Sequence, residues 1–492
     1  MNLSPAMQVS LAAGFGLVVL AATLLAAHPV IAPALALLPI LMLVAIRQAC
    51  VLGILFVAFS FFRLHEVVPQ LMPLKLPLLL ALGVLGTLAW NLAFRRTTTY
   101  RDSLFTPFLV FFALVTVGVF TGTNTGNAFA YWKDTYVKIA IMVFALAWLL
   151  RRPEDFAKLL LVMLGAGALV ALVALQNKAA GIGLVEGTRV TIGRDIGSML
   201  GDPNDLSLVL LFGAGWALAA ADTVGLGRML RLGGILIFVL IAAAVIATQS
   251  RGGLLGIAAV VGIFAARRVR SKLLLGTAGA LAMAVLFAVA GIDDRQSGGA
   301  HEEGIDESAM GRIYAWQAAF GMALANPLFG VGLDNFYFNY YLFSPHWDGQ
   351  NHAVHSTWFG VMAETGIVGF IAFMTMVITL GVSAFRVRNR LLGDAATPPV
   401  MRAAASALVG GFTGFCVSGT FLTQGFVWPI YVMLALAIAL RQYARTRSDL
   451  QYPAGPECSG PGAPSDNPLL SLNKTGGTRL AARPRMNMGD QQ

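Results

Sequence analysis

Hydrophobic segments close to twenty residues long recur along this chain from Val9 to Leu440. A helix needs about 20 mostly apolar residues to cross the hydrocarbon core of a bilayer. Hydrophobic residues make up 57% of the chain and charged residues only 12%, whereas a soluble domain carries roughly 25% charged residues. Since backbone polar groups in lipid must be paired within each helix, we expect an all-α, polytopic transmembrane bundle of about 12–14 helices.

The apolar segments also divide the chain into regions. Helices are predicted near residues 8–27, 29–46, 48–62, 74–94, 104–121, 135–150, 156–176, 206–221, 232–249, 252–267, 272–290, 353–382, 402–420 and 424–441. The regions are an N-terminal transmembrane part (1–290), a large loop with an amphipathic helix (291–352), a second transmembrane part (353–441) and a tail (442–492). The tail is rich in Pro, Gly, Ser and Asn and has little to bury, so we expect it to be disordered.

Positive charge is distributed unevenly between alternate loops. When the N-terminus is placed in the cytosol, the cytosolic side receives Arg47, Arg95, Arg96, Arg101, Arg151, Arg152, Arg228, Arg231, Arg267, Arg268, Arg270, Lys272, Arg386, Arg388, Arg390, Arg402, Arg441, Arg445 and Arg447. Because cytosolic loops are enriched in Lys and Arg, this pattern predicts cytosolic termini and a periplasmic large loop. The same bias explains the net charge of +10 without a nucleic-acid partner.

Several arginines remain on the predicted periplasmic side, against this trend: Arg63, Arg189, Arg194, Arg251, Arg295 and Arg312. A guanidinium presents a planar set of donors that suits phosphate, and it stays charged at any working pH. For each arginine alone, contact with lipid headgroups is the favoured explanation. For Arg194 and Arg251 together we favour binding of a substrate diphosphate.

Two polar turns accompany these arginines. Arg251 lies in the segment from Thr248 to Gly253, where adjacent glycines allow close backbone approach and expose amides to an anion. An ordinary interfacial turn is the alternative. Asp202, Pro203 and Asp205 follow Arg194 and suggest a metal-binding pair of carboxylates, but they also form a good helix start. We therefore expect Asp202 to cap a helix and expect no metal.

The large loop contains an amphipathic pattern. Ile313, Trp316, Phe320 and Leu324 recur at helical spacing, which predicts a helix lying on the membrane or on the bundle. Asn326-Pro327 ends this helix, and a turn-rich segment from Gly330 to Phe336 follows. The aromatic residues that come next either stack on sugars or form an interfacial belt, and they are Tyr337, Tyr340, Tyr341 and Trp347.

Three of the six histidines, His346, His352 and His355, lie within ten positions of one another. A zinc site would need further ligands, and no Cys or clear carboxylate accompanies them. A general base is the better fit, since the pKa of histidine lies near working pH. His355 begins a predicted helix, so its side chain either faces an aqueous cavity or is hydrogen-bonded at the interface.

These motifs, in this order and topology, resemble the O-antigen ligase and polymerase superfamily of bacterial envelope glycosyltransferases. The segment from Ser250 to Gly253 is similar to the family's arginine between two core helices. Gly311 to Trp316, followed by Asn326 to Gly332, is similar to its large-loop signature. His355 with Glu364-Thr365-Gly366 resembles its histidine-bearing helix, although Ser356 stands where the family often has Asn.

The resemblance implies a GT-C type glycosyltransferase in the bacterial inner membrane, with its active site facing the periplasm. The implied donor is a glycan on undecaprenyl diphosphate, and the implied acceptor is lipid A core or a growing polysaccharide, with membrane lipids around both. Arg194 and Arg251 would hold the diphosphate, and His355 would take the acceptor's proton in an inverting displacement without metal or cofactor. The further residues expected to bind diphosphate or glycan are Arg189, Arg312, His352 and Tyr337.

Two other functions are compatible with the sequence. A repeat-unit polymerase of the same superfamily needs the same donor site and differs only in its acceptor. A lipid-linked oligosaccharide flippase is also a polytopic helical protein. However, a flippase would be expected to carry charges inside its helices along a path, and the predicted helix interiors here are nearly free of charge.

Overall fold

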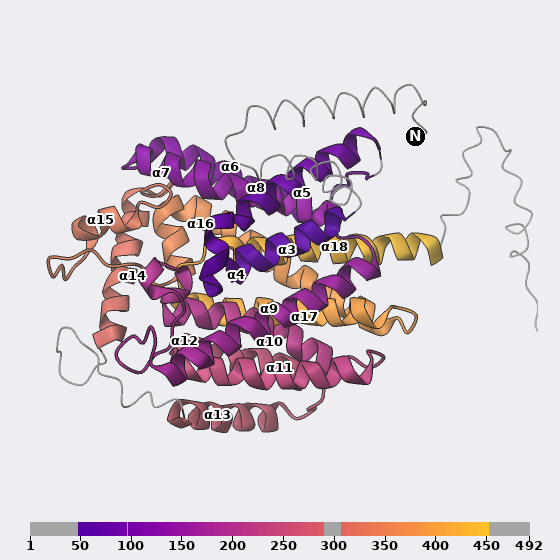
Figure 1. Ribbon diagram of the computed structural model, residues 1–492. Helices are drawn as coiled ribbons and strands as arrows, with labels where there is room; N and C mark the ends of the chain where they lie inside the picture. Colours follow the sequence, from indigo (N-terminus) through magenta and orange to yellow (C-terminus); the bar gives the residue numbers. More distant parts are fainter. Residues whose placement is uncertain (1–47, 96, 290–306, 452–492) are drawn as a thin grey trace, which may run out of the picture. The chain divides into compact units, whose positions relative to one another are not determined.

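Helices make up the secondary structure of the chain in a computed structural model, which describes residues 48–95, 97–289 and 307–451 (Figure 1). The helices and short helical turns are α3 (Ala49–Phe61), α4 (Leu64–Val67), η1 (Pro69–Leu74), α5 (Leu76–Ala93), α6 (Phe105–Thr121), α7 (Thr125–Tyr131), η2 (Trp132–Tyr136), α8 (Val137–Leu149), α9 (Pro153–Ala180), η3 (Arg194–Ile196), η4 (Met199–Gly201), α10 (Pro203–Asp222), α11 (Arg228–Ala247), α12 (Arg251–Ala265), α13 (Lys272–Val289), α14 (Glu307–Ala325), α15 (Phe336–Phe343), α16 (Thr357–Gly393), α17 (Pro399–Ser418), η5 (Gly419–Phe421) and α18 (Trp428–Gln451). No β-strand occurs in these ranges, so the all-α prediction is confirmed for them.

The predicted membrane helices agree closely with the observed ones. Each prediction from 48–62 to 424–441 has a counterpart, while the predictions at 8–27 and 29–46 lie outside the described residues. Six of the described helices, α5, α9, α10, α11, α16 and α17, are long and apolar enough to cross a membrane, and shorter apolar helices accompany them. The chain is therefore a multi-pass membrane protein. The largest differences in boundary are at the ends of α16 and α18, which continue to Gly393 and Gln451, past the predicted ends at 382 and 441.

Helix α10 occupies the centre of the bundle, where it packs against α9, α11, α12 and α17. Its contact with α17 depends on small residues, since a Cβ atom on Gly215 would lie 2.9 Å from the backbone nitrogen of Gly411. Helices in lipid associate through such close backbone approach, because burial of apolar surface gives little driving force there. The contact fixes the axial position of α10 and therefore the position of its first residues. The helices up to Arg447 belong to one compact unit.

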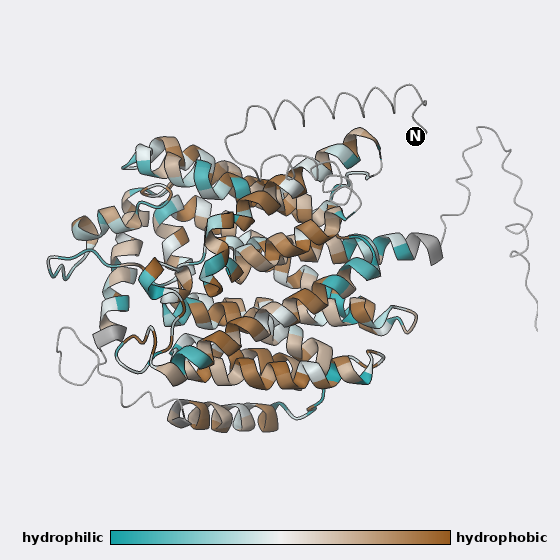
Figure 2. Cartoon of the chain, viewed as in Figure 1, coloured by the Kyte–Doolittle hydropathy of each residue, from teal (hydrophilic) through white to brown (hydrophobic). Residues whose placement is uncertain are grey.

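Polar residues gather at the two ends of the helices and apolar residues lie between them (Figure 2). At one end, Arg441 and Arg445 pair with Asp102 at 3.1 and 2.8 Å, and Arg267 pairs with Asp222 at 3.2 Å. These ion pairs join loops that were predicted to share the cytosolic side. The predicted grouping of basic loops is thus found in the described residues, and the assignment of this end to the cytosol stays a prediction. We call it the basic end.

A sharp break divides α16 at Gly366, whose backbone has φ 70° and ψ −176°. The segment that follows α14 enters this break. Val331 and Gly332 donate backbone hydrogen bonds to the carbonyls of Ala363 and Glu364 at 2.9 and 3.2 Å, and Val368 donates to Pro327 at 3.3 Å. A side chain at Gly366 would strike the Pro327 carbonyl oxygen at 2.6 Å. We call this arrangement the loop lock, formed by residues 326–336 and 363–368.

Glu364 completes the loop lock with its buried carboxylate. Its two oxygens accept hydrogen bonds from the backbone amides of Asp334 at 2.9 Å and Phe336 at 3.2 Å. These amides lie at the start of α15, where a helix leaves its first donors without partners. Glu364 therefore joins α15 to α16 and fixes the direction in which the large loop continues.

The predicted amphipathic helix exists as α14, and it packs on the bundle mainly through small residues outside the predicted apolar stripe. Ala315, Ala318, Ala319 and Met322 are fully buried, and α14 packs mainly against α16 and α15. Of the predicted apolar stripe, Ile313, Phe320 and Leu324 remain 41–56% exposed, while Trp316 stacks on Phe359 with ring centroids 5.1 Å apart. Small side chains thus hold α14 against the bundle, and the larger ones face outward.

Candidate active site

Three helices begin close together at the end of the bundle opposite the basic end. We call this the site end. Asp202, Ser250 and Ser356 cap α10, α12 and α16 with their side chains. Asp202 Oδ1 accepts from the amides of Asn204 and Asp205 at 2.7 and 3.3 Å, which confirms the predicted capping role. Each helix start carries a partial positive charge, so the site end favours an anion.

Arg189 holds two of these helix starts together. Its guanidinium donates to the Thr248 carbonyl at 3.2 Å, to Asn204 Oδ1 at 3.1 Å and to Glu186 Oε1 at 3.4 Å, and the residue is only 5% exposed. Asn204 Oδ1 also accepts from Ser250 Oγ at 2.8 Å. The three guanidinium nitrogens therefore already engage protein oxygens, and these contacts favour a positioning role for Arg189. Its predicted contact with substrate stays a prediction.

Arg251 is the first residue of α12 and is half-buried. The preceding turn reverses through Gln249, which has φ 49°, and Ser250 then accepts from the Gly253 amide at 3.1 Å. A Cβ atom on Gly252 would lie 3.3 Å from the ring of Phe421. The turn is thus held from both sides, and the guanidinium is presented at the start of a helix.

Arg194 lies in the exposed loop before α10. Its Nη1 donates to the Gly201 carbonyl at 3.2 Å, next to the cap residue Asp202. Ser198 ties the same loop to Glu66 of α4 through a 2.5 Å hydrogen bond, and Arg63 forms an ion pair with the same carboxylate. The loop therefore holds Arg194 beside the start of α10, while most of its side chain is accessible.

His355 precedes α16, and its backbone has φ 43°, an uncommon value for a residue with a side chain. Burial and the nearby Arg312 guanidinium lower the pKa of His355 below its ordinary value, with a smaller contribution from His352 in the same direction. The Asp202 carboxylate opposes this shift. His355, Arg312 and the cap of α10 are therefore close enough to interact electrostatically. A lowered pKa keeps the imidazole neutral and able to accept a proton at neutral pH.

The segment 419–424 connects these elements, and sequence reasoning missed it. The Arg312 guanidinium lies 5.9 Å from the centre of the Phe421 ring, which also lies close to Gly252. Thr357 Oγ1 donates to the Leu422 carbonyl at 2.7 Å, and Gln424 Nε2 donates to Asp205 Oδ1 at 2.6 Å. This segment therefore touches α10, α12, α14 and α16. The polar Gln424 between two apolar helices was the signal that could have identified it.

The remaining predicted residues lie on the outer part of the large loop. His352 is exposed and pairs with Asp348 at 2.9 Å. Tyr337 is 51% exposed, and its ring meets Phe338 edge to face at 5.9 Å. Among the described residues the structure thus groups Arg251, Arg312 and His355 around segment 419–424, with Arg194 beside the α10 cap, and leaves Tyr337 apart from them.

The chemistry available at the site end follows from this grouping. Guanidinium groups and helix starts can bind a compact anion, and a neutral imidazole can accept a proton beside it. Among the described residues, no group of three or more His, Cys, Asp and Glu side chains is arranged to hold a metal ion.

Comparison with known protein families gives a match, which covers part of the site end. Residues 236–374 match the family model described as O-antigen ligase. The match covers less than half of the chain and runs from α11 into α16. It includes Arg251, Arg312 and His355 and does not include Arg189 or Arg194. The predicted resemblance to the O-antigen ligase superfamily is confirmed for this stretch. Among curated protein sequences, none matches the chain.

Proposed function

We propose that this membrane protein transfers a glycan from undecaprenyl diphosphate to an acceptor hydroxyl in the periplasm. The premise is that residues 236–374 match the O-antigen ligase family. One observation carries the proposal. Arg251, Arg312 and His355 belong to three different helical elements that adjoin segment 419–424: Arg312 lies over the Phe421 ring, Gly252 beside Arg251 packs close to the same ring, and Thr357, two residues after His355, donates to the Leu422 carbonyl. Glycan transfer needs a cation at the leaving diphosphate and a proton acceptor beside the acceptor hydroxyl, and these residue types supply both.

The diphosphate is the leaving group of the reaction, and its developing charge must be stabilised. Arg251 and Arg194 would hold it, with the starts of α10 and α12 contributing their partial charges. In a site partly shielded from water, each of these interactions is stronger than in bulk solvent. Arg312 lies next to His355 and would contact the phosphate nearest the sugar.

His355 would act as the general base. The acceptor oxygen attacks the anomeric carbon and forms the new carbon–oxygen bond, while the bond between that carbon and the phosphate oxygen breaks. The electron pair leaves with the diphosphate, and the acceptor's proton moves to the imidazole of His355. A single displacement of this kind inverts the anomeric configuration, and the lowered pKa of His355 leaves the base ready at neutral pH.

The acceptor distinguishes a ligase from a polymerase. A ligase transfers finished chains to lipid A core, whereas a polymerase joins repeat units into a growing polysaccharide on its carrier. We favour the ligase because the matched family is described as O-antigen ligase. In a deletion strain, long chains that accumulate on the carrier and are missing from lipid A core would support the ligase. Single repeat units on the core or carrier would support the polymerase.

Variants of Arg251 and His355 test the assignment of the site. We expect Arg251→Ala and His355→Ala each to lower glycan transfer by at least about 100-fold, because the first loses charge stabilisation and the second loses the base. The measurement is surface polysaccharide together with lipid-linked glycan extracted from the same cells, in which the donor should accumulate.

Matched controls are available at both positions. Arg228 is an exposed arginine at the other end of the helix preceding Arg251, and His346 is an exposed histidine of the large loop. Arg228→Ala and His346→Ala should transfer glycan normally. Normal surface polysaccharide in Arg251→Ala and His355→Ala, at equal protein levels in the membrane, would remove the assignment.

A further inference from the structure

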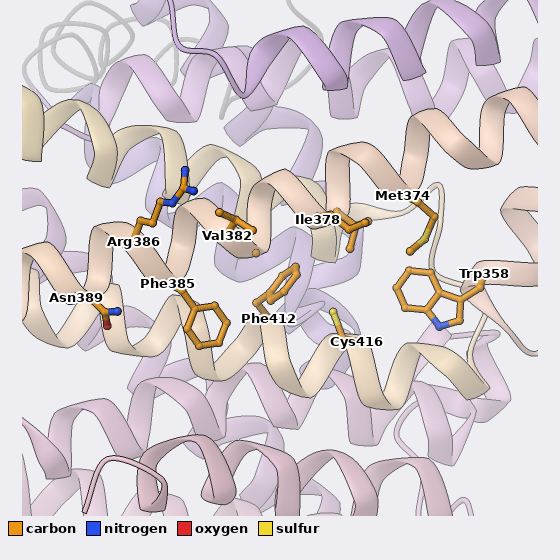
Figure 3. Close-up of a pocket in the computed structure, with 11 residues that line it drawn as sticks. Trp358, Met374, Ile378, Val382, Phe385, Arg386, Asn389, Phe412 and Cys416 are labelled. Carbon is orange, nitrogen blue, oxygen red and sulfur yellow. The ribbon is translucent and has the colours of Figure 1, made fainter.

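Two grooves run along α16 and share one ridge. The first, of about 590 Å³, lies between α16 and α17, and the second, of about 900 Å³, lies between α16 and α6. Ile378, Val382 and Arg386 line both grooves. Since they are spaced four residues apart, they form one outward row of α16. Figure 3 shows the first groove, with Trp358 and Met374 at one end and Arg386 and Asn389 at the other.

The walls of both grooves are mainly apolar and suit hydrocarbon, although Ser103, Thr106 and Ser383 also line the second groove. The first is lined largely by apolar side chains, including Val377, Phe385 and Phe412. The second contains Thr375 and Thr379, whose hydroxyls donate to the carbonyls one turn earlier in α16, at 2.8 and 2.7 Å. These hydroxyls are therefore satisfied within the helix, and no unpaired donor of theirs faces the groove.

Arg386 supplies a positive charge where the two grooves meet at the basic end. Its side chain is exposed, and among the described residues it forms no hydrogen bond or ion pair. Arg441, which also lines the second groove, is engaged by Asp102, Ser383 and Ser103 at 2.8–3.1 Å. Arg386 is thus available to an anion outside the protein, and Asn389 lies beside it in the first groove.

We propose that a glycerophospholipid with an anionic headgroup binds across this ridge, with its phosphate at Arg386 and one acyl chain in each groove. Two hydrocarbon chains joined at one phosphate match two apolar grooves joined at one cation. A single polyisoprenoid chain would occupy one groove and leave the other empty. Anionic lipids are concentrated in the cytosolic leaflet, which is the side predicted for the basic end. This lipid site is separate from the site end and does not depend on the proposed glycan transfer.

Native mass spectrometry of the full chain, purified in detergent, tests this proposal with phosphatidylglycerol and phosphatidylcholine as probes. We expect Arg386→Gln to weaken phosphatidylglycerol binding about tenfold or more, because a charge-assisted phosphate contact is lost. Arg390→Gln is the control, since Arg390 lies one turn further along α16, is exposed, and lines neither groove. Val382→Trp should weaken binding of both lipids, because the larger side chain would fill part of the two grooves that Val382 lines.

Three results would overturn the proposal. Equal losses in Arg386→Gln and Arg390→Gln would indicate general surface electrostatics. Unchanged phosphatidylglycerol binding in Arg386→Gln, with a normal elution profile of the protein, would exclude Arg386 as the phosphate contact. A polyisoprenyl phosphate that co-purifies and competes with phosphatidylglycerol would assign the grooves to the carrier lipid.

Discussion

At the scale of single residues, His355 combines a strained backbone with a side chain whose pKa is lowered. A non-glycine residue in the left-handed region costs of order 1 kcal/mol, so the surrounding contacts must hold it there. The neighbouring Thr357 is bonded to segment 419–424, and Val354 accepts a 3.1 Å hydrogen bond from Trp316. Hydrogen bonds of the residues before and after His355 thus fix its backbone. Burial and Arg312 are the main causes of the lowered pKa of its imidazole.

The pH dependence of glycan transfer should report on the interaction between His355 and Arg312. If neutral His355 is the base, kcat/KM falls on acidification with a midpoint below the ordinary histidine pKa of about 6.5. Arg312 lowers the pKa of His355 because a nearby positive charge disfavours the imidazolium. We therefore expect Arg312→Gln to raise that pKa and to move the acid limb of the kcat/KM profile to higher pH.

Arg312→Lys provides the control for charge. It keeps a cation near the imidazole, so its acid limb should stay close to that of the parent protein even if binding of the donor weakens. An acid limb that is identical in Arg312→Gln and the parent would mean that His355 is not the titrating base.

Arg189 illustrates what residue types alone do not reveal. The sequence predicts the phosphate-binding capacity of a guanidinium, but it does not indicate which acceptors the fold brings to it. The carbonyl of Thr248 and the amide oxygen of Asn204 are remote in sequence and meet Arg189 only after α10 and α11 have packed. The capping role of Asp202 was predictable because it depends only on the next three residues.

At the scale of elements, the break in α16 separates a short segment next to the site from a long membrane span. Ala363 and Glu364, before Gly366, accept backbone hydrogen bonds from the large loop, whereas most of the α16 residues that line the two grooves come after it. The loop lock therefore connects the placement of α14, and with it Arg312, to the same short segment that follows His355.

Gly366→Ala should disrupt this connection. An alanine would need the same left-handed φ of 70° while its Cβ met the Pro327 carbonyl oxygen at 2.6 Å. We expect a loss of about 2 kcal/mol or more of stability, seen as a lower melting temperature in detergent, with faster proteolysis of the large loop.

Gly165→Ala is the matched control, because Gly165 lies within α9 and a Cβ there meets nothing within 4 Å. In a helix this change should be neutral or stabilising by up to about 1 kcal/mol. Equal melting temperatures for the two variants would show that the loop lock does not stabilise the fold.

The membrane helices were predictable because lipid leaves the backbone few alternatives, so an apolar run of sufficient length defines a helix. The packed face of α14 was not predictable from its apolar stripe, because small residues such as Ala315 and Ala319 allow the closest approach. The loop lock and segment 419–424 were also missed. They depend on contacts between parts of the chain that are far apart in sequence and have no local pattern in common.

At the scale of the whole molecule, the two ends of the described bundle differ in chemistry. Arginines at the basic end include several that pair with aspartates, whereas at the site end Arg189 and Arg194 lie beside the start of α10, Arg251 begins α12 and Arg312 acts electrostatically on His355. The positive-inside rule assigns the basic end to the cytosol. If this assignment is correct, the site end opens to a compartment without nucleotide sugars, as a lipid-linked donor requires.

Cysteine labelling of intact cells tests the orientation. Gln350 is an exposed residue of the large loop, and Ala395 is exposed between α16 and α17 at the basic end. We expect a membrane-impermeant maleimide to label Gln350→Cys in cells whose inner membrane is intact, and to label Ala395→Cys only after lysis. The parent protein, with its three native cysteines, sets the background. Labelling in the reverse order would place Arg194 and Arg251 in the cytosol and end the proposed function.

The loop lock also limits how the large loop can be exchanged between proteins. Three of its bonds run between main-chain atoms of residues 327–332 and of α16, and the Glu364 carboxylate accepts two more. Exposed side chains in this stretch are therefore free to vary, as at Leu328, which is 60% exposed. Adding or deleting one residue between Asn326 and Asn335 would shift each donor away from its acceptor. A chimera that carries a foreign large loop therefore has to preserve the length of this stretch, together with its glycines, before any of its sugar-facing side chains can be compared.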